Sequence, residues 1–279
     1  MKPEDFLVTD NWVGRPVARK EDIRLVRGEA SYVDDLDMDC YHAAILRSPY
    51  PHARIKNIDT SRAAALPGVL GFVTGEEIEK QTQPVAARAI TRPAVQYVMA
   101  VGKVRYVGEA VVAVVAVDAY IAHDALDLID VDYELLQPVV RIGDAVKEDA
   151  PLVFEEAGSN ILLHETMVHG DLEAAYQEAD LTVKEKFHVH RYSSTPLETL
   201  AVIAKHQKGD DSFVLWANDQ QHGRSVVNVC NSLGLTLDRL RLIVPDSGGG
   251  FGIKLALWPY LVIMCLLSKK VSKPVKWIQ

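Results

Sequence analysis

A glycine-rich stretch near the carboxyl end of the chain has the residue types best suited to binding a ligand. It reads PDSGGGFGIK over residues 245–254, and four of its ten residues are glycine. Glycine permits positive φ angles and lets a backbone approach a ligand without interference from a Cβ atom. Successive N–H groups in such a turn can surround an anion, and the N-terminus of a following helix adds to the attraction. The sequence therefore predicts a ligand cradle here, with a tight structural turn as the alternative.

The common nucleotide-binding motifs do not fit the spacing of this stretch. A P-loop has adjacent glycine and lysine, but Ile253 separates Gly252 from Lys254. Serine or threonine should follow the lysine, and Leu255 stands there instead. A dinucleotide fingerprint that began at Gly248 would need glycine at position 253. The spacing therefore argues against a free-standing nucleotide-binding protein.

Gln220 is a second candidate for ligand binding. It follows a predicted strand at 212–217 and precedes a predicted helix at 223–233, a type of turn where ligand-binding groups often lie. Its amide could donate a hydrogen bond to an oxo or phosphate oxygen. On local sequence alone, a solvent-facing glutamine beside Gln221 is the favoured interpretation.

A histidine pair is the one possible metal-binding pattern. His188 and His190 lie on a predicted strand at 181–190, so both imidazoles should point to the same face. The sequence shows no third ligand nearby, which favours surface or partner-facing histidines over a metal site. No serine lies in a G-x-S-x-G elbow, and no close pair of carboxylates suggests an acid–base couple.

Composition narrows the class of protein. The chain has 279 residues, of which 48% are apolar and 24% charged, and this is enough for one large or two smaller domains. A net charge of −8 argues against a nucleic-acid partner. The longest apolar run, 255–267, is too short to span a bilayer, and no secretion signal is visible. Three widely separated cysteines fit reduced thiols, so we expect a cytoplasmic protein.

The predicted elements suggest two domains of the α+β class. Residues 1–24 are polar and predict an extended arm, and residues 25–142 alternate strands with short helices. The apolar run 110–116 predicts a central strand covered on both faces. An acidic, loop-rich segment begins at 143, so we place the second domain at 143–279. Further elements are predicted at 41–46, 54–58, 62–66, 69–73, 118–128, 129–133, 171–178, 198–205, 239–244, 255–267 and 275–278.

Several segments resemble, in the same order, the molybdenum-binding subunit of one enzyme family. This is the xanthine dehydrogenase, aldehyde oxidase and carbon monoxide dehydrogenase family of molybdenum hydroxylases. The segments are VGRP at 13–16, RGEASYVDD at 27–35, RSPYPHARI at 47–55, LPGV at 66–69, VRYVGE at 104–109, VDYE at 131–134, PLET at 196–199, GGGFGIK at 248–254 and PVKW at 274–277. The resemblance implies an α/β hammerhead domain at 25–142, followed by an incomplete first molybdopterin-binding domain at 143–279.

The resemblance also implies a molybdenum–pterin cofactor, as molybdopterin or its cytosine dinucleotide form. In that family a backbone N–H of the glycine loop and a glutamine side chain approach oxygen ligands of the molybdenum. The matching residues here are Phe251 and Gln220, while Gly249, Gly250 and Gly252 permit the close approach. Preorganised donors of this kind stabilise charge that develops at a metal-bound oxygen.

The implied activity needs more than this chain. The complete enzyme would hydroxylate a C–H bond of an aldehyde or N-heterocycle with water, and electrons would pass to iron–sulfur clusters and FAD on partner subunits. The family's general-base glutamate is expected on a downstream molybdopterin-binding chain, so no catalytic residue is assigned here and the isolated chain is expected to be inactive. Leu255 replaces a glutamate typical of purine-oxidising members, which disfavours purines. The alternative is a non-catalytic fragment that binds a partner subunit without carrying cofactor.

Overall fold

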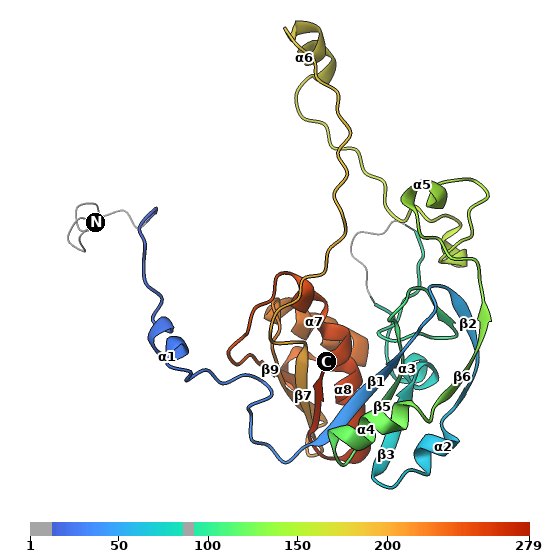
Figure 1. The fold of residues 1–279 in the computed structure, drawn as a ribbon, viewed down its shortest axis with the longest axis vertical. Helices are drawn as coiled ribbons and strands as arrows, with labels where there is room; N and C mark the ends of the chain where they lie inside the picture. The colour runs from blue at the N-terminus through green and yellow to red at the C-terminus, as the bar shows by residue number, and fades with distance from the viewer. Residues whose placement is uncertain (1–12, 86–91) are drawn as a thin grey trace.

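Two β-sheets carry the fold in this computed structural model, which describes residues 13–85 and 92–279 (Figure 1). In order across the seven-stranded sheet, the strands are β3 (Val69–Thr74), β5 (Ala110–Ala116), β1 (Tyr41–Arg47), β10 (Val275–Ile278), β7 (Ala201–Gln207), β8 (Ser212–Ala217) and β9 (Leu240–Ile243). The three-stranded sheet has the order β4 (Lys103–Val104), β2 (Ala53–Asp59) and β6 (Asp130–Leu135). This mixed architecture agrees with the α+β class that the sequence predicted.

The large sheet joins the amino- and carboxyl-terminal parts of the chain. Strand β1 pairs in parallel with β10, with Tyr41 opposite Val275 and His42 opposite Lys276. Strand β10 then pairs antiparallel with β7, and β8 pairs in parallel with β9. Strands β1, β3 and β5 from the amino-terminal part and β7 to β10 from the carboxyl-terminal part therefore share one continuous sheet.

The helices are α1 (Asp22–Val26), α2 (Ser61–Ala64), α3 (Gly75–Gln81), α4 (Ala119–Leu126), α5 (Ile142–Ala145), α6 (Leu172–Glu178), α7 (His222–Leu233) and α8 (Trp258–Val271), with short 3-10 turns η2 (Glu155–Ala157), η3 (Leu237–Arg239) and η4 (Ile253–Ala256). Helices α2, α3, α4 and α8 pack against the large sheet, whereas α1, α5 and α6 lie away from it (Figure 1). Helix α8 packs against β7, β3 and α7, and all of its residues from Leu261 to Ser268 are buried. This burial accounts for its almost uninterrupted apolar sequence.

The predicted central strand is confirmed. All seven residues of β5 are buried, and the strand lies between β3 and β1 in the large sheet. Alternate residues of β5 contribute to two different hydrophobic clusters: Ala113 and Val115 join the one that contains α8, whereas Val112 and Val114 join the one that contains residues of β2 and β4. A strand covered on both faces has no polar side, which is why its sequence is uniformly apolar.

The predicted strand at 181–190 is wrong. This segment is irregular and exposed, and together with α6 it projects from the body of the molecule (Figure 1). Its alternating pattern supplies one apolar face, but a strand also needs a hydrogen-bonding neighbour. Among the described residues no strand pairs with this segment, so its backbone has no neighbour with which to form a sheet.

The amino-terminal arm differs in part from the extended segment expected at 1–24. Helix α1 includes residues 22–24, and Asp22 forms an ion pair with Arg19 in the preceding turn. Residues 1–12 lie outside the described part of the chain. Across the described ranges, none of the helices is both long and apolar enough to cross a bilayer.

Candidate functional site

The glycine loop turns sharply between β9 and η4. Gly249 and Gly252 have φ angles of 97° and 94°, so the predicted need for glycine is confirmed at both positions. Phe251, between them, has a φ of 47°, which is uncommon for a non-glycine residue. Such a backbone persists only where the surroundings hold it, and it is concentrated at ligand-binding sites.

The helix expected directly after the loop begins later than its sequence suggested. The turn η4 follows Gly252, and α8 starts only at Trp258, with Pro259 in its first turn. The N-terminus of α8 is therefore not part of the loop. The donors available for a ligand are the N–H groups of the loop itself.

Three consecutive backbone donors of the loop are free. The N–H of Gly248 donates to Oε2 of Glu198 at 2.7 Å, and the N–H of Gly252 donates to Oε1 of Gln220 at 3.2 Å. Between them, the N–H groups of residues 249–251 have no acceptor among the residues that the structure describes. The Phe251 residue is 74% exposed, whereas Gly249 and Gly250 are half-buried. A row of unused donors of this kind suits an anionic or oxygen-rich ligand.

Gln220 lies against the same loop. A Cβ atom at Gly250 would be 2.5 Å from Cδ of Gln220, so only glycine leaves room for the amide. Because Oε1 accepts the Gly252 N–H, the amide group Nε2 is left as a donor; the orientation is assigned from that hydrogen bond. The structure therefore brings together the predicted site residues Gln220, Gly249, Gly250, Phe251 and Gly252.

A buried aspartate fixes the turn that carries Gln220. Oδ1 of Asp219 accepts the N–H of Gln221 at 2.7 Å, and Oδ2 accepts the Ser225 hydroxyl at 2.7 Å. The Asp219 side chain is fully buried. These bonds hold the end of β8 to the first turns of α7. An aspartate shortly before a helix is a recognisable signal in the sequence, and it could have indicated this role for Asp219.

A buried ion pair lies at the base of the loop. The Lys254 side chain is fully buried, and its Nζ is 2.7 Å from Oε2 of Glu198. The same oxygen accepts the Gly248 N–H, so one carboxylate contacts both ends of the loop. Both residues belong to segments that carry the family resemblance, but the sequence assigned neither of them a role. A charged residue at the edge of a long apolar run was the available signal.

The start of the loop is tied to the amino-terminal arm. Both terminal nitrogens of Arg24 in α1 donate to the Asp246 carboxylate, each at 2.6 Å, and the Ser31 N–H donates to it at 2.9 Å. The hydrogen bond from Arg24 is the main cause that lowers the pKa of Asp246 from 3.8 to about 2. This contact joins residues 222 positions apart in sequence.

A hollow of about 300 Å³ adjoins the site. It is lined by Gln221, Arg224, Ser225, Asn228, Leu255, Ala256 and Trp258. Gln221 and Leu255 are sequence neighbours of Gln220 and Lys254, which places this hollow beside the wall formed by the glycine loop. The Leu255 residue is 41% exposed.

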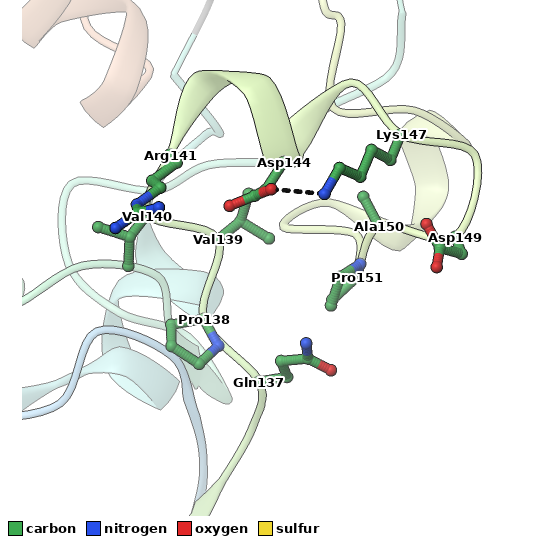
Figure 2. A pocket seen from close by; sticks show the side chains of 10 residues that line it. All are labelled: Gln137, Pro138, Val139, Val140, Arg141, Asp144, Lys147, Asp149, Ala150 and Pro151. Atoms are coloured by element: carbon green, nitrogen blue, oxygen red, sulfur yellow. Dashed lines mark hydrogen bonds and ion pairs between the residues drawn. The ribbon is translucent and has the colours of Figure 1, made fainter.

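The hollow in Figure 2 has a different character. Its volume is about 370 Å³, and residues 137–151 of the segment around α5 form it without contributions from the glycine loop. Two of its charged side chains, Asp144 and Lys147, pair with each other at 2.7 Å. None of the predicted site residues lines this hollow, so it is not the candidate site.

The histidine pair shows no sign of a metal site. The rings of His188 and His190 contact edge to face with centroids 5.2 Å apart, in the exposed segment that was predicted as a strand. Within the described residues, no three histidine, cysteine, aspartate or glutamate side chains cluster in a way that could hold a metal ion.

Comparison with known families shows which protein family this chain belongs to. Residues 27–137 match the aldehyde oxidase and xanthine dehydrogenase a/b hammerhead domain, and residues 153–279 match a molybdopterin cofactor-binding domain. The chain belongs to the large-subunit family of the molybdenum hydroxylases. This confirms the resemblance seen in the sequence, and it assigns the glycine loop and Gln220 to a cofactor-binding domain.

The relatives of this molybdenum hydroxylase chain are considerably longer. The nicotine 6-hydroxylase large subunit of Paenarthrobacter nicotinovorans is 35% identical over 98% of the chain, and the carbon monoxide dehydrogenase large chain of Afipia carboxidovorans is 35% identical over 94%. The crystal structure of quinoline 2-oxidoreductase from Pseudomonas putida 86 superposes with a TM-score of 0.86 at 34% identity, over 94% of the chain. The chain spans only 34% of each of these relatives. Their names show that the first two are subunits of larger enzymes.

The geometry fits the cofactor of this family. A molybdenum–pterin centre presents oxygen atoms that accept hydrogen bonds, and the loop presents three free N–H groups beside the free amide nitrogen of Gln220. The cradle also requires glycine at position 250, where a Cβ atom would displace the amide.

Proposed function

We propose that this chain forms one wall of the molybdenum-cofactor site in a molybdenum hydroxylase. The N–H groups of residues 249–251 and Nε2 of Gln220 would face the cofactor, as molybdopterin or its cytosine dinucleotide form. The observation that carries the proposal is the row of unused donors next to the amide. The wall belongs to a cofactor domain at 143–279, which follows a hammerhead domain at 25–142.

The chain's own residues bind and orient rather than transfer protons. When bound, the cofactor supplies the redox chemistry that hydroxylates an aldehyde or N-heterocycle C–H bond with water as the oxygen source. Fixed N–H donors stabilise negative charge near them without reorganising, and Asp219 keeps Gln220 in place for this purpose. The general base would come from polypeptide beyond these residues, because the relatives extend to about three times this length.

Leu255 favours substrates without a polar edge at this side of the pocket. Its apolar side chain lies half-exposed beside the cofactor wall and cannot pair with the hydrogen-bonding edge of a purine. An aldehyde or an N-heterocycle with an apolar face therefore fits better. The names of the nicotine- and quinoline-oxidising relatives refer to N-heterocycles, which accords with this choice.

The projecting segment 161–197 is the region that we expect a partner chain to cover. Its apolar side chains are exposed, among them Phe187 at 87%. We expect a downstream molybdopterin-binding chain to cover them, and iron–sulfur and flavin subunits to accept the electrons in a cytoplasmic complex. The names of the relatives as large subunit and large chain are consistent with such an assembly.

Molybdenum and pterin content test the proposal directly. The chain would be purified with and without the downstream polypeptide, and we expect stoichiometric cofactor only in the combined preparation. Gly250→Ala should abolish loading because its Cβ atom would displace the Gln220 amide. Gly223→Ala is the matched control, since it lies near the site in helix α7 with open space around it.

Each other outcome has a definite meaning. Stoichiometric cofactor on the isolated chain would show that no second chain is required. If neither preparation contains cofactor, the alternative holds, and the chain is a non-catalytic fragment that binds a partner subunit. If Gly250→Ala and Gly223→Ala contain equal amounts of cofactor, the glycine loop is not part of the cofactor site.

A further inference from the structure

The shape of the glycine loop depends on the buried ion pair at its base. Lys254 in η4 is fully buried, and the Glu198 side chain is 15% exposed. A buried charge is costly unless a partner and hydrogen bonds compensate it, so each residue requires the other. The two are 56 positions apart, and their contact fixes the loop onto the segment that precedes β7.

One carboxylate oxygen holds the two ends of the loop together. Oε2 of Glu198 accepts hydrogen bonds from the Gly248 N–H and from Nζ of Lys254, both at 2.7 Å. The three free N–H groups lie between these two anchors. Hydrogen bonds to a charged acceptor are about twice as strong as neutral ones, so this oxygen is a strong restraint on the part of the loop that carries the three N–H groups.

The loop also packs directly on the glutamate. A Cβ atom at Gly248 would be 2.5 Å from Cβ of Glu198, which shows how closely the backbone approaches the side chain. At the other end, the Lys254 carbonyl lies 3.5 Å from the backbone N–H of Gln220. Movement of Lys254 would therefore displace the loop and the turn that carries Gln220.

We propose that Glu198 and Lys254 are positioning residues that hold the glycine loop in its donor-presenting form before any ligand binds. The pair would set the direction of the N–H groups of residues 249–251 and their distance from the Gln220 amide. The inference concerns the loop itself; it rests on the proposed function only for the identity of the ligand that the loop receives.

Hydrogen exchange of the loop amides tests the inference without cofactor. The full 279-residue chain, in the assembly in which it purifies, would be compared with Glu198→Gln, Lys254→Met and the double variant. In either single variant, we expect exchange at the hydrogen-bonded loop amides of Gly248, Gly252 and Ile253 to rise about tenfold or more, because a hydrogen bond to a charged group that holds the loop is lost. Exchange in β5 should stay unchanged.

The double variant and a remote ion pair supply the controls. Glu198→Gln combined with Lys254→Met leaves no buried charge, so its Tm should recover relative to either single variant. Lys103→Met breaks another largely buried lysine pair, with Glu155 at 2.5 Å, and should leave exchange at 248–254 unchanged. Should a single variant fail to fold, the double variant still shows whether loop exchange depends on the pair.

Failure of this inference is distinguishable from failure of the proposed function. Unchanged loop exchange in both single variants, or additive losses of Tm in the double variant, would overturn the positioning role. Faster loop exchange with undiminished molybdenum content in the assembly would leave the positioning role intact and contradict the assignment of the loop to the cofactor.

Discussion

At the scale of single residues, the proposed site is a set of hydrogen-bond donors that have no acceptor among the described residues. The loop and Gln220 use two of their groups to hold each other, through the Gly252 N–H and Oε1 of the amide. The remaining donors all lie on the same stretch of backbone and on Nε2. Because buried or half-buried donors are normally paired in native proteins, donors without an acceptor among the described residues favour a binding surface over a purely structural turn.

Replacing Gln220 by glutamate should separate its hydrogen bond within the loop from its role as a donor to a ligand. The introduced carboxylate would still accept the Gly252 N–H, but it would offer a second acceptor oxygen in place of the Nε2 donor. In Gln220→Glu we therefore expect an unchanged Tm and a loss of at least tenfold in molybdenum content. Gln221→Glu introduces the same charge one residue away and should retain the metal. Equal metal content in the two variants would contradict the role of the amide.

At the scale of elements, an ion pair between Arg24 and Asp246 joins helix α1 to the glycine loop. Arg24 lowers the pKa of Asp246 from 3.8 to about 2, so the folded state binds fewer protons than the unfolded one. The stabilising contribution is therefore fully present above about pH 4 and is lost as the pH falls toward 2. The arm should remain attached at pH 4 and detach as the pH approaches 2.

Hydrogen exchange in α1 as a function of pH measures this attachment. After correction for the pH dependence of the exchange chemistry, exchange at residues 22–26 should accelerate between pH 4 and pH 2 before exchange in β5 does. In Arg24→Ala, exchange at residues 22–26 should already be fast at pH 4 and should not accelerate further between pH 4 and pH 2. A step of equal size in that variant would mean that a different group controls the arm.

Helix α8 should be the most sensitive helix to truncation of its side chains. Leu261 is fully buried in the cluster that α8 shares with β7, so Leu261→Ala removes transfer energy and leaves a cavity. We expect the free energy of unfolding to fall by about 2–5 kcal/mol, as measured by denaturant titration. Tyr120→Ala, in an exposed position of α4, should change it by less than about 0.5 kcal/mol.

At the scale of the whole molecule, two features matter for function. The β1–β10 pairing unites the hammerhead strands with the cofactor-domain strands in one sheet, which gives the glycine loop a rigid support. The segment 161–197 instead extends from the body with its apolar side chains exposed. Exposed apolar side chains gathered on one projecting segment are typical of a region that a further chain covers.

A charge placed on the projecting segment should affect assembly but not folding. Phe187 is largely exposed, so Phe187→Asp should leave the Tm of the chain unchanged. If the downstream chain covers this segment, the same variant should reduce co-purification at least tenfold, because a buried unpaired carboxylate is costly. Glu185→Asp, two residues away, keeps the charge and should co-purify normally. Undiminished co-purification of Phe187→Asp would place the partner elsewhere.

The local patterns of the sequence were sufficient for much of the fold and part of the site. The uniformly apolar run 110–116 predicted a strand covered on both faces, because only such a strand lacks a polar side. The glycines at 249 and 252 predicted positive φ, because other residues are strained there. The order of the family motifs predicted that the loop and Gln220 would serve one cofactor domain.

Tertiary structure alone decided which distant residues meet. The pairing of Glu198 with Lys254, of Arg24 with Asp246 and of β1 with β10 joins segments between 56 and more than 200 positions apart. No local pattern specifies such a partner, because the energy of a buried charge or a strand edge depends on what the whole fold places beside it. The same reason explains the failure at 181–190, where a clear strand pattern finds no neighbour among the described strands. The glycine loop was visible in the sequence, but the ion pair that holds its shape was visible only in the fold.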